Sequence, residues 1–450
     1  TWIHVKTWIH VKTRLHVPGF HHSARPSIYQ MNVIVFEDSG VENLYPVTTG
    51  RPAYAITCAS LRLIDFLKSL NSRMIGIVRP FLERIQMLAF PELEQSLDLS
   101  QRWTLLVNAR LAPTVKNWEK IGTLMESSNQ LLPEGILIRV GWATAAAIIP
   151  TSTLQDHPRS NWPEIIESLG SSPDCEVTED ELSLFDYPHE IIDSNIQSFS
   201  DNLSYRIAQG NYTEKYKNVF VADGVQIVDP VLFDSKPGPI VIDADVKIGP
   251  FCFIRGPVYI GPRTRISEHA SIKDCVSISH TCKIGGEVES TILEAYTNKQ
   301  HHGFLGHSYL GSWINLGAGT CNSDLKNTYG MVNMQYGSEK VASGMQFIGC
   351  IMGDYAKTAI NTSIFTGKTI GTASMVYGFA TTNVPSFVNY ARTFEKVGNL
   401  PPEVIVTTQK RMFSRRNVIQ RPCDIELILD MYRNTQHERP DGLSDEPISL

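Results

Sequence analysis

Isoleucine recurs at every sixth position through the middle of the chain, and this spacing limits the possible folds more than any other feature. An α-helix and a simple strand have side-chain periods of 3.6 and 2, so neither produces it. The residue four positions after each isoleucine is small or compact. A hexapeptide repeat of this kind predicts a parallel β-helix, in which each short strand adds one rung to the last. The isoleucines are Ile242, Ile248, Ile254, Ile260, Ile266, Ile272, Ile278 and Ile284.

The repeat is expected to run without a break from about Ile240 to Glu289. Two stretches, 290–308 and 321–341, interrupt it, and Leu310 and Leu316 resume the pattern between them. Three hexads per turn give roughly five to six turns, enough for a solenoid to be stable by itself. Lys368 stands where a small inward residue is expected. The final set, in phase with Leu310, is Met352, Thr358, Ile364, Ile370 and Val376.

The N-terminal half has a different pattern, in which short apolar runs alternate with helical spacing. Such alternation predicts a mixed or parallel sheet flanked by helices, an α/β domain. The polar stretch 168–183 is expected to be a loop. We expect strands at 32–36, 74–78 and 103–107, and helices at 55–70, 82–90, 188–209, 402–416 and 424–436.

These patterns divide the chain into four parts. Residues 1–30 begin with a duplicated TWIHVK and precede the first methionine, Met31. We expect them to be a leader upstream of the functional start and outside any packed domain. The α/β domain then spans 31–235, the β-helix 236–385, and a helical and disordered C-terminal tail 386–450.

Composition narrows the function classes. A hydrophobic content of 42% and a charged content of 19% are ordinary for a soluble globular protein. The net charge of −6 gives no reason to expect nucleic acid or an anionic membrane as a partner. No apolar run approaches the ~20 residues of a membrane span. The eight cysteines form no CxxC pair, which predicts structural thiols in a reducing, cytoplasmic compartment.

Because the inward positions of the solenoid are aliphatic, the chemistry is expected on its outer faces and in the interruptions. The first interruption contains three histidines, at 301, 302 and 307. A histidine can act as the general base that acyl transfer to an amine requires, because its pKa lies near neutrality. Backbone N–H groups of the glycine-rich step 315–320 could stabilise the developing oxyanion. Arg255, Lys299 and Lys326 are cations suited to a phosphate.

These residues carry a resemblance to a known family. The run GHSYLGSWINLGAGT followed by CNSDLK, at 306–326, resembles the acetyltransferase half of the bifunctional N-acetylglucosamine-1-phosphate uridyltransferase/glucosamine-1-phosphate acetyltransferases. The resemblance implies a left-handed β-helix, a homotrimer, acetyl-CoA as co-substrate and an amino-sugar 1-phosphate as acceptor.

Site residues follow from the same motif match. His307 resembles the general base of the family but lies one residue closer to Tyr309 than in the family, so His302 is a second candidate. Asn322-Ser323-Asp324-Leu325 replaces the N-Y-D-G run of the family. Gly317 and Ala318 match the acyl-CoA side. The expected substrate-binding residues are Arg255, Lys299, Tyr309, Asn315, Asn322 and Lys326.

The N-terminal half resembles a divergent branch of the sugar nucleotidyltransferases. Arg51-Pro52 echoes the end of the phosphate-loop signature of that family, while its glycine-rich segment and lysine are missing. Residues 105–110 resemble the strand that ends in a magnesium-binding aspartate, but no aspartate is present. The resemblance implies that Arg51 and Arg110 bind a nucleoside triphosphate. Mg²⁺ is expected only if this half makes a nucleotide sugar similar to UDP-N-acetylglucosamine.

Two other functions stay open at this point. His302 and His307 have the spacing seen in γ-class carbonic anhydrases, in which three histidines and a water form a catalytic zinc site. His269 or His280 would supply the third ligand. The remaining alternative is a trimeric scaffold without catalytic activity.

Overall fold

The structure is a computed structural model that describes residues 31–127, 135–169, 176–179 and 182–445. For 176–179 it describes the backbone alone. The expected leader at 1–30 lies outside the described residues, as do the final residues of the expected tail.

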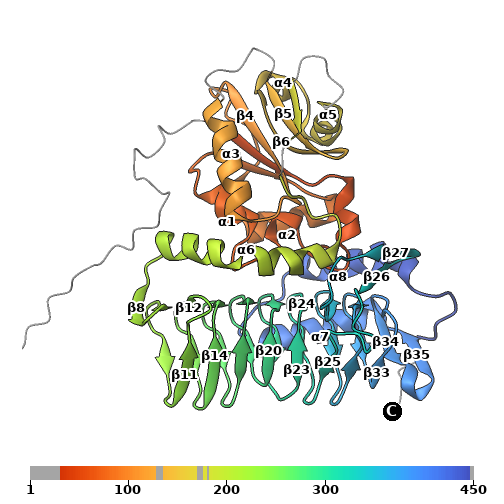
Figure 1. The fold of residues 1–450 in the computed structure, drawn as a ribbon. Coiled ribbons are helices and arrows are strands. Elements are labelled where there is room, and N and C mark those ends of the chain that lie inside the picture. The colour runs from red at the N-terminus through yellow and green to blue at the C-terminus, as the bar shows by residue number, and fades with distance from the viewer. Residues whose placement is uncertain (1–30, 128–134, 170–175, 180–181, 446–450) are drawn as a thin grey trace, which may run out of the picture. The chain divides into compact units, whose positions relative to one another are not determined.

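A seven-stranded mixed sheet forms the N-terminal half, as the alternating pattern predicts (Figure 1). The strands expected at 32–36, 74–78 and 103–107 are β1, β2 and β4, and β1 pairs in parallel with both of the others. These strands are almost wholly buried because helices and loops cover both faces. In order across the sheet they are β3 (Leu93–Glu94), β2 (Met74–Ile77), β1 (Asn32–Phe36), β4 (Trp103–Asn108), β6 (Ala143–Pro150), β5 (Ile136–Val140) and β7 (Glu176–Glu179).

The helix expected at 55–70 is wrong over its first half. Ala59 and Ser60 have positive φ angles, and Cys58 pairs with Leu61 in a tight bridge, so the helix begins only after Arg62. Part of the stretch expected to be a loop at 168–183 is the edge strand β7. The α-helices of this half are α1 (Leu63–Lys68), α2 (Glu83–Ala89), α3 (Val115–Ser127), α4 (Ser152–Gln155), α5 (Trp162–Ser168) and α6 (Pro188–Gln209).

The hexapeptide region is a parallel β-helix, which confirms the predicted left-handed β-helix class. Each turn contributes one strand to each of three faces, and we call these faces 1, 2 and 3. Face 1 is β9 (Val219–Val221), β12 (Ile240–Ile242), β15 (Val258–Ile260), β18 (Val276–Ile278), β21 (Ile292–Leu293), β24 (Tyr309–Leu310), β28 (Cys350–Met352) and β31 (Lys368–Ile370), preceded by the antiparallel β8 (Thr213–Tyr216).

The other two faces repeat the same parallel pairing. Face 2 is β10 (Gln226–Ile227), β13 (Lys247–Ile248), β16 (Arg265–Ile266), β19 (Lys283–Ile284), β22 (Asn298–Lys299), the bridging residue Asn315, β29 (Lys357–Thr358), β32 (Met375–Val376) and β34 (Val388–Ala391), closed by the antiparallel β35 (Lys396–Asn399). Face 3 is β11 (Val231–Asp234), β14 (Cys252–Arg255), β17 (Ser271–Lys273), β20 (Glu287–Glu289), β23 (Phe304–Gly306), β25 (Cys321–Asn322), β30 (Ser363–Ile364) and β33 (Phe379–Ala380).

The isoleucine ladder forms the core of this β-helix. Ile242, Ile260 and Ile278 stack on face 1, and Ile248, Ile266 and Ile284 stack on face 2. All six are essentially inaccessible to solvent. Side chains alternate across a strand, so the residues before these face 2 isoleucines point outward.

The predicted extent of the repeat needs two corrections. The β-helix begins at β9, so the boundary predicted at 236 falls after its first turn. The stretch 290–308 is not an excursion: β21, β22 and β23 make it a complete turn. Ile260 pairs with Ile278, 18 residues later, whereas Ile278 pairs with Leu293, so this turn is three residues shorter. The shorter turn hides the hexad spacing. Lys299 also takes an inward position that isoleucine occupies elsewhere.

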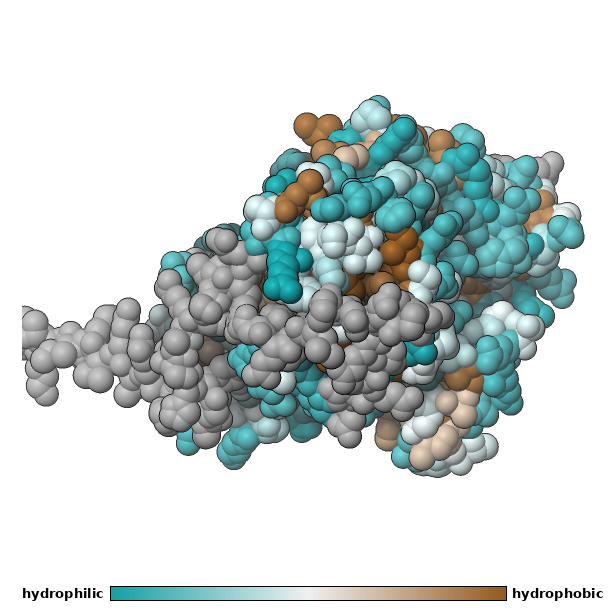
Figure 2. All heavy atoms as spheres, turned by 90° about the horizontal axis from the view of Figure 1, so that it is seen from above, coloured by the Kyte–Doolittle hydropathy of each residue, from teal (hydrophilic) through white to brown (hydrophobic). Residues whose placement is uncertain are grey.

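One true excursion leaves the β-helix after β25 and returns at β28. It contains an antiparallel hairpin of β26 (Asn333–Tyr336) and β27 (Glu339–Ala342). Two predicted C-terminal helices are confirmed as α7 (Pro402–Ser414) and α8 (Pro422–Asn434). The view in Figure 2 shows mostly hydrophilic side chains, with small separate hydrophobic areas among the described residues. Within the described residues, no helix is long and apolar enough to cross a membrane.

Candidate functional site

The structure distributes the predicted site residues over several separate places in the chain. His302 precedes β23 and His307 follows it, so the two candidate bases lie at opposite ends of one strand. At about 3.3 Å per residue, the three residues of β23 alone place about 10 Å of extended chain between them. The two histidines therefore do not share one site within a single chain.

His307 lies at the corner between faces 3 and 1, where it forms a pair with Asp324. Its Nδ1 is 2.8 Å from Asp324 Oδ2, and its side chain is 15% exposed. The ring stacks on Phe347 with a centroid separation of 5.2 Å. An aspartate that accepts a hydrogen bond from Nδ1–H sets the tautomer that leaves a lone pair on Nε2. Among the described residues, Nε2 has no hydrogen-bond partner, so this nitrogen can accept a proton.

Asn322 explains why Asp324 reaches that corner. Its side chain points into the β-helix, where it donates to Gly306 O at 3.0 Å and accepts from Gly306 N at 2.9 Å. Two residues later, the Asp324 carbonyl accepts a hydrogen bond from Ile348 N, which anchors the return of the excursion. The predicted substrate contact Asn322 is thus 5% exposed and holds the His307–Asp324 pair in place.

The glycine-rich step lies at the other corner, beside His302. Gly319 N donates to His302 O at 3.1 Å, and Gly319 has a positive φ of 75°. Gly317 N donates to Thr358 O at 3.1 Å, so this amide is already used within the β-helix. His302 is exposed, and no described carboxylate pairs with it. The predicted acyl-CoA residues Gly317 and Ala318 therefore accompany the second candidate base, not the first.

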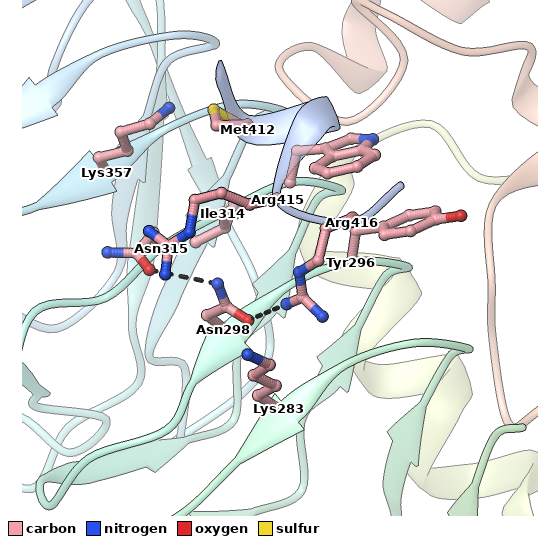
Figure 3. Close-up of a pocket in the computed structure, with 10 residues that line it drawn as sticks. Lys283, Tyr296, Asn298, Ile314, Asn315, Lys357, Met412, Arg415 and Arg416 are labelled. Carbon is pink, nitrogen blue, oxygen red and sulfur yellow. Dashed lines mark hydrogen bonds between the residues drawn. The ribbon is translucent and has the colours of Figure 1, made fainter. Parts of the chain in front are cut away.

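Asn315 faces a cavity of about 250 Å³ on face 2. Its Oδ1 accepts a hydrogen bond from Asn298 Nδ2 at 3.3 Å (Figure 3). The lining residues are Lys283, Tyr296, Asn298, Trp313, Ile314, Asn315, Lys357, Met412, Arg415 and Arg416.

Arg51 and Tyr309 meet in a buried polar cluster between the α/β half and face 1. Arg51 forms ion pairs with Glu294, at 3.1 Å, and with Asp354. Tyr309 is fully buried and donates to Glu294 at 2.9 Å. Burial raises the pKa of the Tyr309 phenol well above its usual value. The geometry does not favour the ligand-binding roles predicted for these two residues, since both are engaged inside the protein.

The three cations expected to bind phosphate are also engaged. Lys299 is 2% exposed and donates to Gly285 O at 3.0 Å and to His301 O at 2.6 Å. Arg255 pairs with Asp274, and their Nε–Oδ1 distance is 2.9 Å. Lys326 donates to the Met331 carbonyl at 2.6 Å. Arg255 also lies three rungs from Gly306, which is about 14 Å at the usual strand spacing.

Arg110 is fully buried, and its guanidinium group already donates hydrogen bonds to acceptors within the protein. Its Nε and Nη2 donate to the Asp38 carboxylate at 2.7 and 2.8 Å, and its Nη1 donates to Phe185 O at 2.8 Å. The same guanidinium also pairs with Asp186. A Mg²⁺ site needs carboxylate oxygens that are not already neutralised by a cation. Asp38 and Asp186 thus do not fit this metal.

The zinc alternative has no cluster to support it within one chain. The described residues contain no group of three His, Cys, Asp or Glu that could hold a metal ion. His269 stacks on Phe251, and His280 contacts Thr281 Oγ1 at 3.1 Å. Burial lowers the pKa of His280 to about 4.

Sequence reasoning missed the partner of His307 and most of the cavity on face 2. Asp324 was visible as the aspartate that this chain shares with the N-Y-D-G run, but its contact with His307 depends on the inward side chain of Asn322. A sequence signal for the cavity did exist. A cation precedes every third isoleucine of the ladder, at Lys247, Arg265 and Lys283.

Comparisons with known proteins agree with the predicted resemblance. Residues 33–208 match a family model described as sugar nucleotidyl transferase. The bifunctional sugar-1-phosphate nucleotidylyltransferase/acetyltransferase of Sulfurisphaera tokodaii is 29% identical over 199 residues, which are 44% of this chain and 45% of that protein. The bifunctional protein GlmU of Ralstonia nicotianae is 32% identical over 117 residues, which are 25% of this chain and 24% of that protein. The matches thus span less than half the length of these curated relatives.

Solved structures that are similar to part of this chain include two acyltransferases. The UDP-N-acetylglucosamine acyltransferase of Francisella novicida is 15% identical, with a TM-score of 0.22, over 48% of this chain and 87% of that chain. AntD, an N-acyltransferase from Bacillus cereus, is 14% identical, with a TM-score of 0.18, over 44% of this chain and 90% of that chain. The family match and the curated relatives confirm the resemblance to bifunctional nucleotidyltransferase–acetyltransferases.

Proposed function

We propose that this protein transfers the acetyl group of acetyl-CoA to the amino group of an amino-sugar 1-phosphate, with His307 as the general base. The observation that carries the proposal is the 2.8 Å contact between His307 Nδ1 and Asp324 Oδ2. His302 has no such carboxylate among the described residues. The names of the curated relatives support the same reaction class.

The proposed reaction needs one proton acceptor and one proton donor. Nε2 of His307 takes a proton from the amino group, and the freed lone pair attacks the thioester carbonyl of acetyl-CoA. The tetrahedral intermediate collapses with cleavage of the C–S bond, and the protonated His307 returns its proton to the departing thiolate. Asp324 stabilises the imidazolium that forms between these steps. The products are an N-acetylated sugar phosphate and free CoA.

A homotrimer would explain why the predicted site residues lie at different corners of one chain. A site between two copies can combine the His307 corner of one copy with the Gly317 and Ala318 corner of its neighbour. Phenylalanines exposed by about half on and near face 3 support such an interface, because apolar patches mark protein contacts. They are Phe347 at 40%, Phe365 at 47% and Phe379 at 51%. The described cysteines are all unpaired, which supports a cytoplasmic location.

Nucleotidyl transfer is the second candidate function, favoured by the family match over residues 33–208. In this reaction a sugar 1-phosphate attacks the α-phosphate of a nucleoside triphosphate and releases pyrophosphate. Pyrophosphate release from UTP or dTTP in the presence of magnesium and hexosamine 1-phosphates measures it. Because Arg110 already neutralises Asp38 and Asp186, substitution of either carboxylate should affect folding more than the magnesium requirement.

The acyl-transfer test follows CoA thiol release with acetyl-CoA and a panel of hexosamine 1-phosphates. We expect His307→Ala to lower turnover by roughly 10²–10⁴-fold, the range for loss of a general base. Asp324→Asn should also lower turnover, because an amide can donate to Nδ1 and stabilise the tautomer that is protonated on Nε2. His302→Ala is the matched control and should retain activity.

Two outcomes would change the assignment. If His302→Ala is inactive and His307→Ala is active, the base is His302, and the site belongs to the corner of Gly317 and Ala318. If no acceptor in the panel releases thiol with the unaltered protein, the acyltransferase proposal fails. Zinc in the purified protein together with that silence would favour the carbonic anhydrase alternative.

A further inference from the structure

The outer column of face 2 is unusually rich in positive charge. Strand pairing places Lys247, Arg265 and Lys283 on three successive rungs. Two asparagine rungs follow, Asn298 and Asn315, and the next rung carries Lys357. Like charges directly opposite each other on neighbouring strands are destabilising. From Lys247 to Lys357 this column carries no carboxylate at all.

Two arginines add positive charge beside the two rungs of this column that carry asparagine. Arg415 and Arg416 follow the last residue of α7. Figure 3 shows their guanidinium groups reaching from this helix end toward the strands, Arg415 toward Asn315 and Arg416 toward Asn298. Arg416 donates a hydrogen bond to Asn298 Oδ1. Four cations, two from strands and two from the segment that follows α7, therefore line one cavity of about 250 Å³.

The positive charges of this cavity have no acidic partner in the part of the chain that the structure describes. Among the described residues, none of Lys283, Lys357, Arg415 and Arg416 forms an ion pair. Lys357 donates to the Tyr355 carbonyl at 2.7 Å. Burial, followed by repulsion from Arg416 and Arg415, lowers the pKa of Lys283, and burial lowers that of Lys357 to about 8. A bound anion would remove this repulsion and supply the missing acceptors.

We propose that the cavity on face 2 binds the phosphate groups of a ligand that carries at least two phosphates. Guanidinium groups bind phosphate oxygens through paired N–H donors, and lysines add point charges. The amides of Asn298 and Asn315 can each turn a donor toward a phosphate oxygen. Tyr296 and Trp313, stacked at 4.1 Å, form an apolar wall against which an organic part of the ligand can pack. This proposal does not depend on acyl transfer, because binding is measured without turnover.

Titration calorimetry with inorganic pyrophosphate at low salt tests the proposal on the full chain. Lys283→Gln and Arg415→Gln are the informative variants, because neither side chain has a described hydrogen-bond partner whose loss would disturb folding. Each should weaken pyrophosphate binding about ten-fold, and the affinity of the unaltered protein should fall as salt rises. Lys247→Gln, on the same column outside the cavity, and Arg411→Gln, on α7 outside the cavity, should bind pyrophosphate as the unaltered protein does.

Competition experiments identify the source of the phosphates. Displacement of pyrophosphate by coenzyme A, and more weakly by dephospho-coenzyme A, would assign the cavity to an acyl carrier. Displacement by UDP-N-acetylglucosamine would assign it to a nucleotide sugar. Absence of saturable pyrophosphate binding, or equal affinity of the two cavity variants and their two controls, would overturn the proposal.

Discussion

At the scale of the residue, Lys299 shows how one polar side chain fits a repeat whose inward positions are otherwise apolar. Its ammonium donates to two carbonyls, Gly285 O and His301 O, where isoleucine would leave them without a donor. Burial still disfavours the charged form and lowers the pKa of Lys299 to about 8. This lysine also hides the hexad pattern and made residues 290–308 look like an interruption of the repeat.

The lowered pKa of Lys299 predicts a specific pH dependence of stability. Because the unfolded chain holds the proton more tightly, the free energy of unfolding should rise with pH between about 8 and 10.5, the ordinary value for lysine. Lys299→Met removes this contribution, so its unfolding free energy should change less over that window. Urea unfolding of both proteins from pH 7 to pH 10.5 measures the difference. Parallel pH profiles would show that Lys299 keeps the ordinary pKa of a lysine in the folded protein and would contradict the prediction.

At the scale of the element, the isoleucine period was sufficient to predict the fold class, the inward residues and the phase of the late strands. Such a prediction works because each rung repeats the same local contacts. The location of the site could not be predicted as fully. Sequence order suggested one cluster around 298–326, but β23 separates His302 from His307. The roles of Asn322 and Tyr309 depend on inward and interdomain contacts that the motif alone does not contain.

Strand β16 allows the inward and outward positions to be compared directly. Ile266 is 1% exposed in the core of the β-helix, while its neighbour Arg265 points outward. We expect Ile266→Ala to lower the free energy of unfolding by about 2–5 kcal/mol, because it leaves a cavity between two rungs. Arg265→Ala should change it by less than about 1 kcal/mol, and relief of column repulsion could make that change favourable. Equal losses in chemical denaturation would contradict the inward assignment.

At the scale of the whole molecule, the α/β half and the β-helix are joined by buried polar contacts along face 1. Asn195 on α6 accepts from Ala59 N and donates to Cys275 O, each at 2.8 Å. Arg51 adds to this contact between the two halves by forming ion pairs with Glu294 and Asp354. The Arg-Pro motif that resembles a nucleotide loop therefore serves the contact between the two halves. Sequence alone could not reveal this, because the acidic partners lie more than 200 positions away.

Replacement of Arg51 should show how much this contact between the two halves contributes to the free energy of unfolding. Arg51→Met leaves Glu294 and Asp354 buried without a cation, which typically costs about 3–5 kcal/mol of stability. The loss should grow as pH rises from about 5 to 8. Without the cation, burial raises the pKa of the two carboxyl groups in the folded variant, so the unfolded chain releases their protons first and is favoured as pH rises. Arg84→Met is the matched control, since its pair with Glu426 also links distant segments but is exposed, and it should cost much less stability than Arg51→Met. Urea unfolding monitored by circular dichroism at both pH values separates the two variants. If Arg51→Met costs no more than Arg84→Met, Arg51 does not hold the two halves together, and its nucleotide-binding role would regain support.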